Sequence, residues 1–127
     1  MNSKEEVKIV NIQLISTFLF ILSLVISLLL TYNSKLEVEG KKGFLNDKQN
    51  YSISVFNRIF IVCLSLAFLY TNIKNKEIAK SKSENTNPFN LQIMASELSL
   101  LAALIVTYVV VSSGEYSIIT SVENPSL

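Results

Sequence analysis

Three long apolar segments constrain this chain more than any other feature of its sequence. They run over residues 9–32, 53–73 and 91–113. An α-helix rises ~1.5 Å per residue, so roughly 20 residues cross a hydrocarbon core about 30 Å thick. Inside that core every backbone N–H and C=O must be paired, and a helix pairs its own. The sequence therefore predicts an all-α membrane protein, a compact bundle of three transmembrane helices with short connectors.

The segments between these spans are too short to form further domains. The first connector covers residues 33–52, the second covers 74–90, and a tail follows over 114–127. Chains below ~40 residues rarely build a core without cross-links. The first apolar run is also longer than the ~7–15 apolar residues of a signal peptide, so we expect it to be retained. A single membrane domain over residues 1–127 is the expected organisation.

Local patterns in the connectors predict where the helices end. Residues 74–82 are expected to continue the second helix past the membrane surface, until the polar run 83–87 breaks it. Asn87, followed by proline, is typical of a helix start. In residues 36–45, apolar and acidic side chains alternate and a glycine-containing turn follows, which is the pattern of a short hairpin. An isolated hairpin is only marginally stable, so a flexible loop is the expected state. Gly114 is expected to close the third helix.

The distribution of lysines predicts the orientation in the cell membrane. With three spans, the N-terminal tail and the second connector share one side and together carry six lysines, against four in the first connector and none in the C-terminal tail. Positively charged loops stay in the cytoplasm. The N-terminus is therefore expected in the cytoplasm and the C-terminus outside. The abundance of Lys, Ile and Asn favours an AT-rich bacterial genome.

The sequence contains no pattern typical of a catalytic site. It has no histidine, and its single cysteine, Cys63, lies mid-span, where it is expected to be a small packing residue. Catalysis by imidazole and metal sites built on histidine are thereby excluded. No nucleotide or cofactor motif is present, and a net charge of +1 gives no case for a nucleic-acid partner. We expect a protein that is not an enzyme and that needs no cofactor.

Two charged residues lie inside the predicted spans. Arg58 and Glu97 are near the N-terminal ends of antiparallel helices, so they belong to opposite faces of the bilayer. Each is expected to extend toward its own interface rather than to pair with the other. Glu97 shares a helix face with Tyr108, and Arg58, Glu97 and Tyr108 are candidate intramembrane contacts. For Glu97 the alternatives are placement at the membrane interface, contact with another subunit, and ion or proton handling. For Arg58 they are an interfacial anchor, or a partner for an acidic group on another protein or for a phosphate.

Small residues recur at intervals of about four along every span. Such stripes let helix backbones approach closely in lipid, where no hydrophobic force drives helices together. The predicted packing residues are Ser23, Ser27 and Thr31 on the first span, Cys63, Ala67 and Thr71 on the second, and Ala95, Ser99, Ala103 and Thr107 on the third. A second polar line on the middle helix, Arg58, Ser65 and Asn72, predicts that this helix contacts two neighbours.

Two functional hypotheses remain open from the residues. The first is a non-catalytic subunit or regulator that binds a membrane-protein partner through its helix faces, with membrane lipid around it. The second is a homo-oligomeric pore: the chain has the size and span number of three-span phage holins, although its lysine-free tail differs from their basic one. It also has the size of small bacterial lipid kinases, but it lacks their acidic cluster at the membrane edge.

Overall fold

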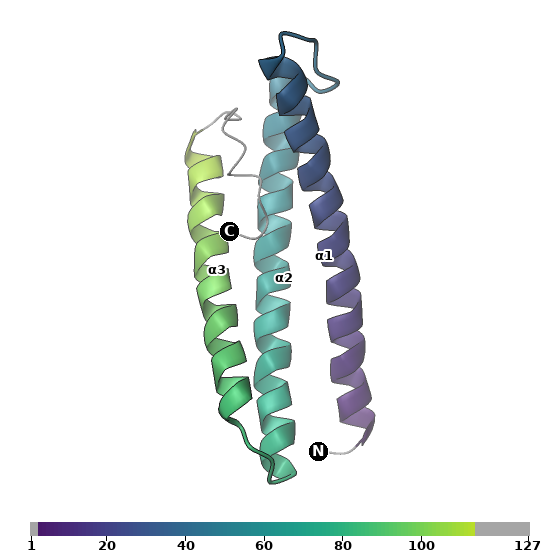
Figure 1. Cartoon of the computed structure of the whole chain (residues 1–127), viewed down its shortest axis with the longest axis vertical. Coiled ribbons are helices and arrows are strands. Elements are labelled where there is room, and N and C mark those ends of the chain that lie inside the picture. Colours follow the sequence, from purple (N-terminus) through teal and green to yellow (C-terminus); the bar gives the residue numbers. More distant parts are fainter. Residues whose placement is uncertain (1–2, 114–127) are drawn as a thin grey trace.

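The computed structural model describes residues 3–113, which form three long helices (Figure 1). They are α1 (Ser3–Val38), α2 (Asp47–Ser81) and α3 (Asn87–Ser113). Each is long and apolar enough to span a membrane. The predicted all-α fold with three membrane-crossing helices and short connectors is confirmed. The expected role of Gly114 lies outside the described residues.

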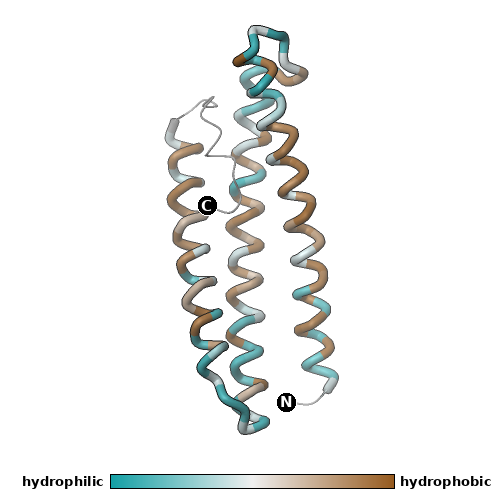
Figure 2. Tube along the Cα trace, in the orientation of Figure 1, coloured by the Kyte–Doolittle hydropathy of each residue, from teal (hydrophilic) through white to brown (hydrophobic). Residues whose placement is uncertain are grey.

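All three helices include residues beyond the apolar spans. Figure 2 shows hydrophobic stretches along the middle of each helix, and hydrophilic residues where α2 meets the second connector. The lysine-rich segment continues α2 to Ser81, and α3 begins at Asn87, as predicted. Polar residues can extend a helix here because water and headgroups solvate their side chains while the backbone remains internally paired.

Two helix ends use the same backbone motif. At the end of α1, Gly40 has φ +77°, and its N–H bonds the Glu37 carbonyl at 3.0 Å while the N–H of Lys41 bonds the Leu36 carbonyl at 2.9 Å. This Schellman pattern also ends α2, with Ser83 at φ 58°. The alternating residues 36–38 therefore belong to α1 and form no hairpin, because the glycine stops a helix here rather than turning a strand.

The first connector is held against α1 before α2 begins. Asn33 Oδ1 accepts from the N–H of Leu45 at 3.1 Å, and a Cβ at Gly43 would lie 2.5 Å from this oxygen, so any larger residue would have to displace the Asn33 side chain. Asn46 then caps α2 reciprocally with Gln49: the Gln49 N–H donates to Asn46 at 2.8 Å, and the Asn46 N–H donates to the Gln49 side chain at 3.0 Å. These contacts fix the turn between α1 and α2.

α2 is the central helix of the bundle. It packs along both α1 and α3, whereas α1 and α3 form no extended interface with each other within residues 3–113 (Figure 1). The α1 face toward α2 repeats every seven residues, as in a left-handed coiled-coil seam. Its buried members are Ile9, Ser16, Ser23 and Leu30. Ser27 and Ser34, each four residues after one of them, are buried as well.

The two neighbours of α2 contact adjacent sides of it. Asn57 and Phe68 contact α1, whereas Tyr51 and Asn72 contact α3. At ~100° per residue, the two contact faces are on average about a quarter of a turn apart. In a four-helix bundle, each helix likewise has two neighbours on adjacent sides. The three helices thus occupy three corners of such a bundle and leave the fourth corner open.

Candidate functional site

A buried hydrogen-bond network joins α1 to α2. The Ser23 hydroxyl donates to Asn57 Oδ1 at 2.8 Å, and Asn57 Nδ2 donates to Ser27 Oγ at 2.9 Å. Asn57 and Ser23 have no exposed surface, and Ser27 is 5% exposed. Serine keeps the helices close enough for these bonds, and a paired amide avoids the cost of an unsatisfied polar group in an apolar interior. The network therefore fixes the depth of α1 relative to α2.

The contacts between α2 and α3 are more widely spaced. At one end the Tyr51 hydroxyl donates to the Val111 carbonyl at 3.1 Å, and at the other Asn72 donates to the Ser96 hydroxyl. Between them Ala103, 2% exposed, lies in the interface. The small side chain at this position is the kind that lets two helices approach closely.

An open groove of about 680 Å³ lies at the vacant corner, on the half of the bundle nearer the second connector. All three helices line it: α1 with Gln13 and Phe20, α2 with Ile61, Leu64, Ser65, Phe68, Asn72 and Asn75, and α3 with Phe89, Gln92, Ala95, Ser96, Ser99 and Ala103. Volumes of this order are typical of ligand pockets. The groove is a concavity along the spans that all three helices share.

The groove has a mixed polar and apolar lining that carries no charge. It combines amides and hydroxyls with aromatic and aliphatic side chains, and it includes no lysine, arginine, aspartate or glutamate. Asn72 and Ser96 are bonded to each other, whereas the side chains of Gln13, Asn75 and Gln92 make no hydrogen bond within residues 3–113. Amides can both donate and accept. The groove thus presents unused hydrogen-bonding capacity beside apolar side chains of the same lining.

Arg58 lies in the interior, which differs from the expected interfacial anchor. Its side chain has no exposed surface, and it is the one charged residue among the buried side chains of residues 3–113. The same face of α2 carries Ser54 and Asn50, one and two turns toward the first connector, and both are also fully buried. The sequence-based estimate concerned only the depth of Arg58 along its own helix, so it did not predict that neighbouring helices cover the side chain.

Glu97 and Tyr108 lie on the outer face of α3. Glu97 is exposed, and Tyr108 is 73% exposed. At ~100° per residue Glu97 faces away from the groove residues Gln92 and Ser99. The structure brings neither residue to Arg58, in agreement with the expectation that Arg58 and Glu97 do not pair.

The structure divides the predicted packing residues between interfaces and outer surfaces. Ser23, Ser27, Thr71 and Ala103 are buried, and Ala67 and Thr107 are half-buried. Thr107 Oγ1 donates to the Ala103 carbonyl at 2.7 Å and approaches the Arg58 carbonyl at 3.5 Å. The remaining four are exposed: Thr31, Cys63, Ala95 and Ser99. Two of these, Ala95 and Ser99, line the groove, so the third-helix stripe serves both an interface and an open surface.

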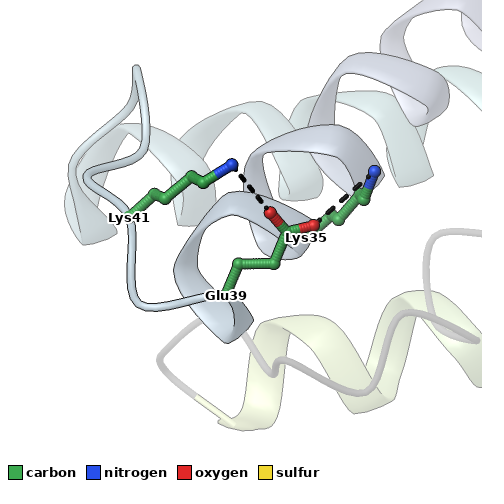
Figure 3. Close-up of polar contacts among 3 residues, drawn as sticks. All are labelled: Lys35, Glu39 and Lys41. Carbon is green, nitrogen blue, oxygen red and sulfur yellow. Dashed lines mark ion pairs between the residues drawn. The ribbon is translucent and has the colours of Figure 1, made fainter.

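Charged residues outside the spans form small surface networks. Near the first connector, Glu39 lies between Lys35 at 3.6 Å and Lys41 at 3.1 Å (Figure 3). At the opposite end Lys82 Nζ lies 2.8 Å from Glu6 Oε1, which links the end of α2 to the start of α1. Hydrogen bonding to Glu6 and its charge raise the pKa of the Lys82 ammonium above its ordinary value. Such exposed pairs are screened by salt and contribute little.

Comparison with known proteins provides no functional assignment, because no family model, curated protein or solved structure matches the chain. Among the described residues, no group of three or more histidine, cysteine, aspartate or glutamate side chains could hold a metal. The function must therefore be argued from the groove and from the buried polar residues.

Sequence reasoning missed several residues that the structure brings into prominence. Asn57 was not selected, although an asparagine inside an apolar span is itself a signal of helix–helix hydrogen bonding. The four-residue stripe on the first span predicted Thr31, whereas the seven-residue repeat from Ile9 to Leu30 selects the face that is buried. The groove amides Gln13 and Gln92 gave no signal, because only the arrangement of three helices brings them together.

Proposed function

We propose that this protein is a non-catalytic membrane subunit or regulator that binds a transmembrane helix of another membrane protein in its open groove. The observation that carries the proposal is the vacant fourth corner, lined by α1, α2 and α3. A helix placed there would contact α1 and α3 as neighbours, as in a four-helix bundle. It would also cover the exposed small residues Ala95 and Ser99, which allow close approach.

The chemistry of the groove favours a helix over a lipid chain. A hydrocarbon chain would offer no hydrogen-bond partner to the amides of Gln13 and Gln92, and removing them from water without a partner costs free energy. A helix with serine, threonine, asparagine or glutamine on one face could pair with them. A helix with a charged face would gain no opposite charge, since none lines the groove. The proposed occupant is a helix with small and uncharged polar side chains.

The proposed location is the cell membrane, with the N-terminus in the cytoplasm and the C-terminus outside, supported by the lysine distribution. The groove would then open in the cytoplasmic half. In a Cys63→Ala background, a single cysteine at Lys42 should react with an impermeant reagent added to intact cells, and one at Ser81 should not. The opposite labelling pattern would reverse this orientation.

Site-specific photo-cross-linking in the native membrane tests the proposed partner. A photoreactive residue replacing Ser99, in the groove, should cross-link to another membrane protein, whereas one replacing Leu101, on the outer face of α3, should not. Ser99→Leu, which fills the groove, should abolish co-purification of the same partner, whereas Leu101→Ile should preserve it.

The homo-oligomeric pore predicts a different result from the same experiment. Cross-linking from Ser99 to a second copy of this chain, together with ion flux through reconstituted vesicles, would overturn the subunit proposal in favour of the pore. Equal cross-linking from Ser99 and Leu101 would show that the groove has no special role.

A further inference from the structure

Two buried polar side chains in the half of the bundle nearer the first connector have no hydrogen-bond partner. They are Asn50, through both Nδ2 and Oδ1, and Ser54, through Oγ. Neither side chain has any exposed surface. Leaving such groups unpaired costs free energy, so native structures rarely keep them without a reason.

Other buried polar residues in the same half are paired, which makes these two exceptional. Asn57 bonds Ser23 and Ser27, Asn33 accepts from the connector backbone, and Ser34 donates to the Leu30 carbonyl. Hydrogen-bond partners are therefore present for these other polar side chains in the interior. The unpaired donors are confined to one stripe of α2, the stripe that leads to Arg58.

Asn50, Ser54 and Arg58 follow one another at four-residue intervals on α2, so their side chains share a face. Side chains lean toward the N-terminus of their helix, which directs the long arginine toward the other two. A guanidinium, a hydroxyl and an amide are a donor set suited to the oxygens of a phosphate group. Arg58 already takes part in an interaction of its own, but its five N–H donors can serve more than one acceptor.

We propose that Asn50, Ser54 and Arg58 form a binding site for a phosphate group, at the end of α2 nearer the first connector. Asn50 is in the first turn of α2, close to where the helix leaves the apolar region, so a phosphate group enters from the membrane surface. The group is the headgroup of an anionic lipid or a free phosphate ion. This site is separate from the groove, which has no charged lining and lies toward the second connector.

The site is tested with the full-length protein, purified and kept in an uncharged detergent that contains no phosphate group. One arm adds inorganic phosphate to these micelles, the other adds phosphatidylglycerol, and the micelles without additive are the reference. The wild-type unfolding temperature should rise in one of the arms: a rise with phosphate identifies the free ion, and a rise only with phosphatidylglycerol identifies the lipid headgroup. No rise in either arm would overturn the proposal.

Variants at the two unpaired residues separate binding from folding. The double variant Asn50→Ala and Ser54→Ala should reduce the affinity for the active probe about tenfold, since two donors to an anionic group are lost. Without the probe it should unfold at a higher temperature than wild type, because two unsatisfied buried groups are removed. Arg58→Lys keeps the charge but not the planar donor fork, and it should bind more weakly than wild type.

Lys48→Gln is the matched control, because Lys48 is exposed in the first turn of the same helix. It should leave the response to the probe unchanged. Two results would contradict the site: a double variant that responds to phosphate and phosphatidylglycerol like wild type, or a Lys48→Gln variant that loses the response and so shows attraction to surface charge only.

Discussion

The two sides of α2 differ in whether their polar side chains are paired within the bundle. Toward α1, Asn57 is buried and both ends of its amide are used by serines across the interface. Toward the vacant corner, Asn75 on the same helix lies in an open groove with no hydrogen bond within residues 3–113. The first arrangement holds the fold together. The second leaves binding capacity available, which is the physical basis for the proposed partner helix.

The largest loss of stability is expected from a larger side chain at the α2–α3 interface. Ala103→Leu should destabilise the protein by about 1–3 kcal/mol, because the added methylenes would push α2 and α3 apart at a residue that is 2% exposed. Ser99→Leu, one turn away in the groove, should unfold near the wild-type denaturant concentration. Denaturant unfolding in mixed micelles measures the stability of both variants. Equal losses would mean that the groove is as tightly packed as the interface.

The next effect should separate the two asparagines of α2. Asn57→Leu removes two hydrogen bonds and leaves two serines to find other partners, so we expect a loss of about 1–2 kcal/mol. The same change at Asn75 removes none and should leave stability unchanged or slightly raised. Unfolding in mixed micelles compares the pair directly. A larger loss at Asn75 than at Asn57 would reverse the distinction between the closed and open sides.

A smaller effect is expected on the outer face of α3. Glu97→Gln should change stability by less than about 0.5 kcal/mol, since Glu97 is exposed and makes no hydrogen bond or ion pair within residues 3–113. It should also leave cross-linking from Ser99 intact. If it instead abolished partner recovery while insertion and folding persisted, the partner would bind the outer face rather than the groove.

The smallest effect should come from the surface pair at the second-connector end. The raised pKa of Lys82 means that its contribution is complete below its unfolded value of about 10.4 and is lost as pH rises through the higher folded pKa. Stability in that alkaline range should therefore fall slightly more in wild type than in Lys82→Gln. Both should converge at high salt. An identical pH dependence of wild type and variant would show that the pair contributes nothing.

The sequence by itself determined the number and type of the helices and several of their ends. An apolar run of about 20 residues can pair all its backbone N–H and C=O groups within itself only as a helix, so the helices follow from composition and length. The extension of α2 to Ser81 and the start of α3 at Asn87 likewise followed from local residues. The end of α1 was misjudged, because Gly40 closes a helix or turns a hairpin with equal ease.

Only the tertiary structure decided which side chains meet. The burial of Arg58 and its alignment with two unpaired donors depend on neighbouring helices, which a depth estimate along one helix cannot include. The groove depends on α1 and α3 lying on adjacent sides of α2, an angle set by contacts such as Asn57 to Ser23 and Asn72 to Ser96. Periodicity gives the faces of a helix, but the choice of face for each neighbour is a property of packing.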